Sequence, residues 1–286
     1  MSRKVVGYKD CCIHVDTKKR PIVTHSVTSK TINTPTHKIQ MSRQYVSPAG
    51  LRRDGRRPHE IRRLRCRFGP VGDCDGSVYL EHGCNKILAV VRGPRALASR
   101  SQGQFDRATV RCTYTQAPFA KTEHRKIRSR DRRTAQIASN ITKTFEAVIQ
   151  THLYPRSEIS IEIQVLQSDG GCVASAMNAT TLALFDAGIP CSDYVVSCTA
   201  GHLDKRPLLD LNYEEESSGG PMVHIAMAPS TSTIITTEMI SKMPVEAFEE
   251  TLLLAQQGCM QMYELFKTSV KERVLELHTS KHHGGE

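Results

Sequence analysis

Cys74, His82 and Cys84 lie close together in the sequence and are residue types that bind metal ions. A structural zinc ion usually takes four cysteine or histidine ligands, supplied as two closely spaced pairs. No second pair follows at such a spacing, and none of the ten cysteines belongs to a C-x-x-C motif. We therefore predict no metal site, and expect small buried residues in a strand pair together with a histidine at the surface.

Positive charge is the second feature with chemical meaning. The formal net charge is +10, and residues 1–67 hold 17 Lys and Arg against 4 Asp and Glu, whereas the remainder holds 22 against 25. A basic region on a near-neutral body is typical of proteins that bind polyanions, although a basic tail that only aids solubility has the same composition. Aromatic residues make up 5 % and Trp is absent, so phosphate contacts are favoured over base stacking.

Composition narrows the class further. Hydrophobic residues make up 39 % and charged residues 24 %, which is ordinary for a globular protein with a hydrophobic core. No apolar run approaches the roughly 20 residues of a membrane helix, and the N-terminus lacks the apolar core of a secretory signal. Scattered cysteines in such a chain favour reduced thiols over a disulfide framework. We expect no membrane partner and no cofactor.

Changes in composition and turn-forming residues divide the chain into regions and strands. Residues 1–46 are rich in Lys, Thr, Ser, His and Pro and predict a flexible basic arm, followed by a folded domain at 47–278 and a disordered tail at 279–286. Alternating apolar residues and turn signals predict the strands, at 77–81, 86–92, 107–115, 159–165, 194–200, 207–211, 222–228 and 232–238. The arginines at 62–67 do not isolate one helix face, and they fit an extended strand at least as well as a helix.

Apolar residues at 3.6-residue spacing predict helices over 134–153 and 245–277. A turn signal before it and a stop signal after it predict a further helix over 174–187. Pro155 ends the first helix, and Gly188 ends the helix at 174–187. Asp169-Gly170-Gly171 forms a tight turn that leads into that helix. The mixture of strands and helices predicts an α+β domain of mixed sheets backed by helices, with a basic N-terminal extension.

Several short patterns, in this order over about residues 50–278, resemble the RNase PH family. They are Arg53-Asp54-Gly55-Arg56, Gly83 with Val91-Arg92-Gly93-Pro94-Arg95, Ala117-Pro118-Phe119, Arg132-Arg133, Gln167-Ser168-Asp169-Gly170-Gly171, Asp186-Ala187-Gly188-Ile189-Pro190 and Leu209-Asp210-Leu211-Asn212-Tyr213. Within the family, the turn at 186–190 and the run 219–221 are most similar to the eukaryotic RNA exosome ring subunit descended from the catalytic archaeal subunit. The basic arm belongs to neither pattern.

This resemblance implies an RNase PH-like fold, assembly into a six-membered ring, and removal of 3′ nucleotides from RNA with phosphate as nucleophile. Active relatives hold the phosphate with a Gly-Thr-Arg-Thr turn at a helix N-terminus, where free N–H groups and the helix dipole favour an anion. The matching residues here are Gly171, Cys172, Val173 and Ala174. The hydroxyls and the arginine are missing, and with them a bidentate grip on phosphate.

The resemblance also places two aspartates at six-residue intervals after the position of Asp210 in active relatives. Those positions hold Glu216 and Met222 here. Glu216 keeps a carboxylate on a longer stem, whereas Met222 cannot bind a metal or move a proton. The acidic run at 214–216 has a second interpretation, as a solvated loop without function. We therefore predict that the chain has no catalytic residues and no metal.

Basic residues match the family better than the acids do. Arg95 and Arg100 fall in a loop that points into the central channel of ring-forming relatives, and Arg132 and Arg133 match positions that contact RNA phosphates. Alternatively, Arg132 or Arg133 pairs with a local carboxylate such as Asp131 or Asp169. The basic stretch at 52–67 is compatible with a subunit interface or with RNA entry.

We expect a structural, RNA-binding ring subunit of the exosome. It would guide single-stranded RNA through the channel to an associated hydrolytic nuclease, beside other RNase PH-type subunits and under S1/KH-type cap subunits. The expected locations are nucleus, nucleolus and cytoplasm, and the expected processes are rRNA processing and mRNA decay. The rival interpretations are an active phosphate-dependent 3′–5′ exoribonuclease and a basic RNA-binding module that works alone, whose ring interfaces would then be exposed.

Overall fold

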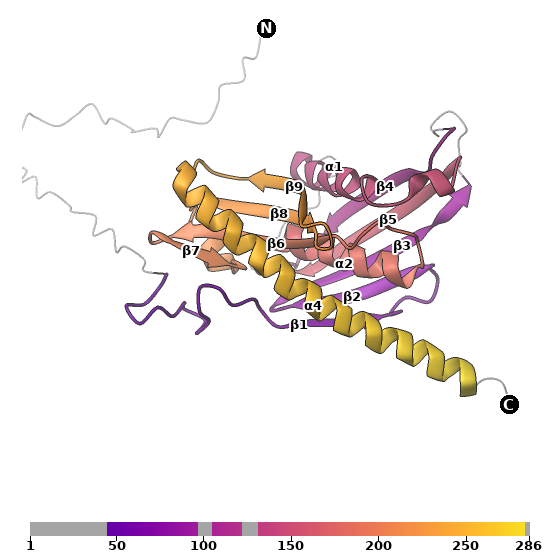
Figure 1. Cartoon of the computed structure of the whole chain (residues 1–286), viewed down its shortest axis with the longest axis horizontal. Helices are drawn as coiled ribbons and strands as arrows, with labels where there is room; N and C mark the ends of the chain where they lie inside the picture. Colours follow the sequence, from indigo (N-terminus) through magenta and orange to yellow (C-terminus); the bar gives the residue numbers. More distant parts are fainter. Residues whose placement is uncertain (1–44, 97–104, 122–130, 284–286) are drawn as a thin grey trace, which may run out of the picture. The chain divides into compact units, whose positions relative to one another are not determined.

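The computed structural model describes residues 45–96, 105–121 and 131–283 (Figure 1). The predicted arm up to residue 44 and the candidate Arg100 lie outside the described residues. The described body begins at Tyr45, whose backbone N–H donates to a carboxylate oxygen of Asp204. Val46, which the sequence placed in the arm, is buried.

A five-stranded sheet forms the first half of the body, with the strand order β1-β2-β3-β5-β4. β1, β2, β3 and β5 pair antiparallel in that order, and β4 runs parallel to β5 at the edge. Alternate residues of β5 are fully buried, so one face of the sheet packs on the core and the other is more open. The strands are β1 (Leu64–Phe68), β2 (Gly76–His82), β3 (Asn85–Ala96), β4 (Thr109–Gln116) and β5 (Ser157–Gln167).

A four-stranded antiparallel sheet forms the second half, with the order β7-β6-β8-β9. Every residue of β8 is buried, as expected for a strand covered on both faces. The strands are β6 (Val196–Leu203), β7 (Arg206–Leu209), β8 (Met222–Ala228) and β9 (Thr233–Met239).

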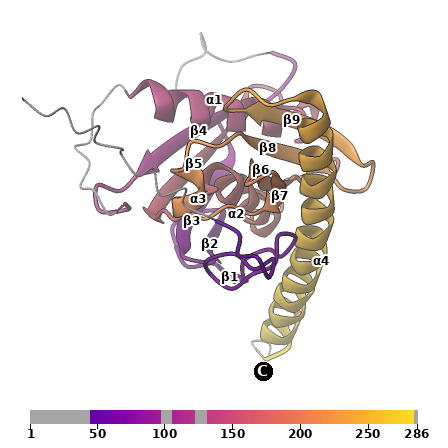
Figure 2. The same cartoon turned by 90° about the vertical axis from the view of Figure 1, so that its left-hand side faces the viewer.

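The helices lie between and outside these sheets. α2 is buried almost all round because it contacts β2 and β3 on one side and β6 and β8 on the other. α1 packs on β4 and β9, and α4 covers the outer face of the second sheet (Figure 2). The helical segments are α1 (Arg132–Glu146), a 3-10 turn (Thr151–Leu153), α2 (Cys172–Asp186), α3 (Tyr213–Glu216) and α4 (Val245–His283).

The predicted α+β fold is confirmed, and two helix ends are corrected. The first helix ends at Glu146 rather than at 153, because Val148 and Ile149 leave the helix and stay buried, with Ile149 bridging to Cys191. Their helical spacing was therefore misleading. α4 runs to His283 and so includes residues 279–283, which the sequence placed in a tail.

The sequence prediction for Cys74, His82 and Cys84 is partly wrong. His82 is buried at 3 % exposure instead of lying at the surface, and Cys84 is exposed. Each cysteine in the described residues is a free thiol. Within this part of the chain, no helix is long and apolar enough to cross a membrane.

Candidate functional site

The glycine turn before α2 is the centre of the site. Gly170 and Gly171 have φ values of +73° and +61°, in the left-handed region that favours glycine. A Cβ on Gly170 would lie 2.4 Å from the backbone carbon of Asn212, so this turn packs directly against the chain after β7. Gly171 is the N-cap of α2 and provides no side chain to satisfy the free N–H groups of the first turn.

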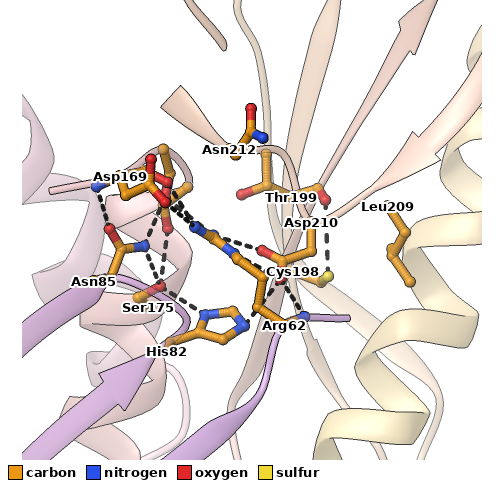
Figure 3. A network of polar contacts seen from close by, with 12 residues as sticks. Arg62, His82, Asn85, Asp169, Ser175, Cys198, Thr199, Leu209, Asp210 and Asn212 are labelled. Atoms are coloured by element: carbon orange, nitrogen blue, oxygen red, sulfur yellow. Dashed lines mark hydrogen bonds and ion pairs between the residues drawn. The ribbon is translucent and has the colours of Figure 1, made fainter. Parts of the chain in front are cut away.

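A buried ionic network holds this turn in place (Figure 3). The guanidinium of Arg62 donates to both carboxylate oxygens of Asp210, at 2.9 and 2.7 Å. The same group donates to the carbonyl oxygens of Asp169 and Gly170, at 2.6 and 3.1 Å. Arg62 therefore ties the chain after β7, at Asp210, to the turn that starts α2.

His82 and Asn85 complete the network from the β2–β3 hairpin. His82 Nε2 lies 3.1 Å from Asp210 Oδ2, and His82 Nδ1 lies 2.9 Å from the hydroxyl of Ser175 in α2. The amide of Asn85 donates to the carbonyl of Gly170 at 2.6 Å. All of these side chains are nearly inaccessible to water, so the network positions the site and does not contact a ligand.

Asp210 is the charged centre of the network. Complete burial opposes its ionisation, but the neighbouring charges of His82 and Arg62 hold its pKa well below the ordinary value of 3.8. The Asp210 backbone adopts φ +52°, which aims the carboxylate back at Arg62. Asp210 is therefore an ionised structural group, and its carboxylate is occupied by partners within the chain.

The acidic run 214–216 is part of a helical turn and not a loop, although its first residue, Glu214, is exposed to solvent. It forms α3, a single helical turn with a capping box between Asn212 and Glu215. Glu215 is buried and forms a bidentate ion pair with Arg52. Glu214 is exposed and pairs with Arg53.

Glu216 points back at the start of α2. Its Oε2 accepts a hydrogen bond of 3.0 Å from the backbone N–H of Gly171. A carboxylate of the chain thus lies at the helix N-terminus, where partial positive charge favours an anion. The capping box of α3 and the Arg52–Glu215 pair fix the turn that carries Glu216.

A cleft of about 300 Å³ opens beside this contact, between α1, the start of α2 and strands β8 and β9. It combines two basic side chains with two acidic ones and a buried histidine. Its lining residues are Tyr114, Gln116, Lys121, Arg133, Thr134, Gln136, Ile137, Ser168, Cys172, Val173, Glu216, His224, Glu238 and Ile240.

Two buried groups in this cleft have shifted pKa values. Burial lowers the pKa of His224 below 6.5, an effect that the carboxylates of Glu216 and Glu238 oppose. Burial raises the pKa of Cys172, whose thiol donates to the hydroxyl of Ser168 at 2.9 Å. At neutral pH the cleft therefore presents a neutral imidazole and a neutral thiol, and its charges come from Lys121, Arg133 and the carboxylates.

The residues that stand where active relatives have catalytic or phosphate-binding groups do not all lie in the cleft. Val173 lines the cleft, where the resemblance implies an arginine in active relatives, and Ala174 is buried in α2. Met222 is not a cleft residue, because it packs in a small apolar cluster with Leu203 and Leu208. Among the described residues, no group of three or more His, Cys, Asp or Glu is placed to hold a metal ion.

The arginines predicted to bind RNA also lie in different places. Arg133 lines the cleft, whereas Arg132 lines a different groove, between α1 and β4. Asp131 is the N-cap of α1 and accepts from the backbone N–H of Arg133, so its carboxylate caps the helix. Arg95, which the sequence placed in a loop, lies within β3, because this strand continues through Ala96 and pairs Arg95 with Glu158. Its side chain is exposed, and its Nη2 lies 3.6 Å from Asp75 Oδ2.

Two arginines of the basic stretch 52–67 have a structural role. Arg52 and Arg62 are buried in ion pairs within this chain, so neither is available for RNA or for a neighbouring subunit. Sequence reasoning also missed His82 and Asn85 as network members. Polar residues at the predicted hairpin turn were the available signal, but the sequence does not show which distant residue each one contacts.

Comparison with known proteins places the chain in a family. Residues 60–190 match the RNase PH model described as the 3′ exoribonuclease family, domain 1, and residues 193–258 match domain 2 of that family. The chain belongs to the RNase PH family of 3′ exoribonucleases.

Its relatives point to one branch of that family. The chain is 43 % identical over 235 residues to an exosome complex component RRP41 homolog from Arabidopsis thaliana, covering 82 % of this chain and 97 % of the relative. It is 40 % identical to human exosome complex component RRP41, covering 82 % and 96 %. The Rrp41 of the archaeon Methanopyrus kandleri is 40 % identical, with 80 % and 95 % covered.

Solved structures support the fold. The crystal structure of rice Rrp46 matches with a TM-score of 0.69 at 22 % identity, covering 77 % of this chain and 100 % of that one. The exosome of Archaeoglobus fulgidus with RNA bound to its active site matches with a TM-score of 0.65 at 18 % identity, covering 76 % and 93 %. At these identities, the likeness shows a shared fold.

Proposed function

We propose that this chain is a non-catalytic, RNA-binding ring subunit of an RNA exosome. Relatives from a plant, mammals and archaea are named exosome components, and the match spans nearly the whole length of each. Other RNase PH-type subunits, S1/KH-type cap subunits and a hydrolytic nuclease are the partners that this role requires. Nucleus, nucleolus and cytoplasm stay predictions from the resemblance.

The contact between Glu216 and the turn at Gly171 carries the non-catalytic part of the proposal. A phosphate nucleophile needs free N–H groups and a cationic side chain at this position. Here the N–H of Gly171 already donates to a carboxylate, and the side chain at 173 is an apolar valine. A phosphate dianion brought to this turn would also meet the negative charge of Glu216 at close range, which is unfavourable.

The rival is an active phosphorolytic exoribonuclease. It has some support, because Glu216 retains a carboxylate and shares its cleft with Arg133 and Lys121. The rival would need Glu216 to release Gly171 when RNA and phosphate bind. It would also need a cation other than residue 173 to hold the phosphate.

The RNA-binding part rests on Arg133 and Lys121, whose positive side chains line the cleft while Arg132 and Arg95 lie exposed elsewhere. Phosphate contacts of this kind hold RNA without reading its sequence, as a conduit requires.

Arg133→Gln tests this role in the chain assembled with its ring partners. We expect weaker binding of single-stranded RNA, and a plot of log affinity against log salt whose slope is smaller by about 0.7. Fluorescence anisotropy of labelled RNA over a salt series measures both quantities. Lys267→Gln, an exposed change on α4, is the matched control. An unchanged slope in Arg133→Gln would remove Arg133 from the RNA path.

A further inference from the structure

A row of three side chains crosses the second sheet and ends in the cleft. Thr199 of β6 pairs with His224 of β8, and His224 pairs with Glu238 of β9. Residues directly opposite each other in antiparallel strands place their side chains on the same face of the sheet. Thr236, two residues before Glu238, bonds to the hydroxyl of Thr144 in α1 at 2.7 Å, so this face lies against α1.

The inner end of the row lies behind the glycine turn. Thr199 Oγ1 lies 2.9 Å from His224 Nδ1, and a Cβ built on Gly171 would lie 3.3 Å from the same hydroxyl oxygen. Thr199 and His224 are 2 % and 7 % exposed. Because Nδ1 is engaged on this buried side, Nε2 is the nitrogen that His224 retains for the cleft that it lines.

The outer end of the row is a carboxylate. Glu238 also lines the cleft, and its Oε2 accepts a hydrogen bond of 3.3 Å from the amide of Asn140 in α1. An ionised carboxylate has roughly four acceptor positions and no donor. One bond from Asn140 therefore leaves Glu238 able to accept a hydrogen bond from a ligand.

His224 is the donor of the row. It is neutral at pH 7, because burial lowers its pKa below 6.5, and a neutral imidazole has one donor nitrogen and one acceptor nitrogen. With the Thr199 hydroxyl donating to Nδ1, the proton lies on Nε2, and the neighbouring carboxylate of Glu238 favours this tautomer. The row then offers the cleft one donor, Nε2–H, beside one acceptor, the carboxylate.

Positive side chains complete the requirements on the ligand. Arg133 and Lys121 line the same cleft and favour phosphate groups. A ligand that fits the whole cleft thus has phosphates beside a neutral group that accepts from His224 and donates to Glu238. A hydroxyl is both donor and acceptor, and each nucleotide of RNA carries a 2′-hydroxyl close to its phosphate.

We propose that His224 and Glu238 bind a ribose 2′-hydroxyl of single-stranded RNA whose phosphates contact Arg133 and Lys121. Nε2–H of His224 donates to the hydroxyl oxygen, and the hydroxyl donates to the carboxylate of Glu238. This inference rests on the proposed RNA-binding role and adds to it a preference for RNA over DNA, because the 2′-hydroxyl is the group that distinguishes them.

Two kinds of charged ligand fit this end of the cleft less well. A metal cation would face the positive charges of Arg133 and Lys121, and no group of three or more His, Cys, Asp or Glu in the described part of the chain is placed to hold one. A phosphate at the row would face the carboxylates of Glu238 and Glu216. A neutral hydroxyl avoids both conflicts.

The test compares two ligands that differ only in the 2′-hydroxyl. They are fluorescent oligouridine and oligodeoxyuridine of equal length, and fluorescence anisotropy measures their affinities for the chain assembled with its ring partners. The ratio of the two affinities is the readout, because a change in the charge of the cleft affects both ligands alike. We expect the wild type to favour oligouridine.

Glu238→Met removes the acceptor and keeps the length of the side chain. We expect the ratio to fall at least about tenfold, which corresponds to about 1.4 kcal/mol and is typical of a hydrogen bond to a charged group. Glu250→Met changes an exposed glutamate of α4 and is the matched control, which should leave the ratio unchanged.

His224→Phe removes the donor and keeps a ring of similar size. The ratio should fall here too, whereas the slope of log affinity against log salt should stay as in the wild type, in contrast to Arg133→Gln. The thermal midpoint shows whether the fold survives loss of the buried bond to Thr199. Glu238→Met leaves that bond intact, so it tests the proposal even where His224→Phe does not fold.

Three results would overturn the proposal. The first is a ratio that Glu238→Met leaves at the wild-type value, and the second is an equal loss of both ligands in that variant. In either case, RNA binding that still depends on Arg133 would leave the proposed function standing. The third is a wild-type assembly that binds neither ligand, which would remove the RNA-binding role as well.

Discussion

Arg62 and Asp210 show that a charged pair can be structural in a chain that is rich in basic residues. Their side chains are 6 % and 3 % exposed, and together they join the turn before α2 to the chain that follows β7. A buried ion pair stabilises little against an apolar substitute, but removal of one partner leaves an uncompensated charge. The pair therefore holds the site by making other arrangements unfavourable.

Asp210→Asn should lower the free energy of unfolding by about 3 to 5 kcal/mol, because Arg62 would keep its buried charge without a counter-charge. Urea denaturation followed by circular dichroism measures the change. Glu214→Gln is the control, since its pair with Arg53 is exposed and contributes at most about 1 kcal/mol. Equal losses in the two variants would contradict the structural role of Asp210.

Asp210 also predicts a dependence of stability on pH. Its pKa is lower in the folded chain than the ordinary value of 3.8, so its ionised form stabilises the fold above about pH 4. This contribution is lost as pH falls through the folded-state pKa. Below about pH 4, the free energy of unfolding of the wild type should therefore fall more steeply than that of Asp210→Asn. Parallel curves would show that Asp210 is not the titrating group.

At the scale of the elements, the packing of the turn before α2 against the chain after β7 decides whether the site forms. Gly170→Ala combines a positive φ with a Cβ at 2.4 Å from the backbone of Asn212 and 2.7 Å from the carbonyl of Leu211. We expect a loss of about 3 kcal/mol or more, from strain and overpacking together.

Gly188→Ala is the matched control for this substitution. Gly188 also has a positive φ, of +68°, but no atom lies within 4 Å of a Cβ built there. Its loss should be limited to backbone strain, about 1 kcal/mol. The difference in unfolding midpoint between the two variants isolates the packing contribution, and equal midpoints would exclude it.

The elements themselves were largely predictable from the sequence. Alternation marked β5 and helical spacing marked α4, because each has an apolar pattern along its own length. α2 was marked instead by the glycine turn before it and the Gly188 stop after it, since it is buried almost all round and has no single apolar stripe. The end of α1 was not predictable from spacing, since Val148 and Ile149 are buried by a bridge to the chain at Cys191 instead of by the helix. Likewise, three consecutive glutamates do not reveal that Glu215 meets Arg52 across 163 positions.

At the scale of the whole molecule, the RNase PH resemblance pointed to the glycine turn before α2 and to Val173, which lines the cleft. The structure added the hydrogen bond from Gly171 to Glu216, which the sequence did not predict. The position of Met222 in an apolar cluster could not be inferred, because its distance from the cleft depends on how β8 packs. Because α2 lies between the two sheets, His82, Ser175 and Asp210 come together in one network. Local sequence patterns carry no information on such long-range contacts.

The unequal charge distribution has a different meaning once the fold is known. Two of the arginines in the basic region 1–67 are buried in the body, so they do not contribute to its exposed positive charge. The proposed RNA contacts, Arg133 and Lys121, come from later in the chain. Net charge therefore predicted a polyanion partner without locating its path.

Phosphate-dependent release of nucleoside diphosphate from single-stranded RNA tests the central claim most directly. The chain is assembled with its ring partners and supplied with Mg²⁺, with and without inorganic phosphate, beside Glu216→Gln and the control Glu214→Gln. The account predicts no diphosphate above the phosphate-free background in any of the three, with RNA still bound in a salt-dependent way. Phosphate-dependent product that Glu216→Gln abolishes and Glu214→Gln retains would show that Glu216 serves catalysis, and would contradict the account.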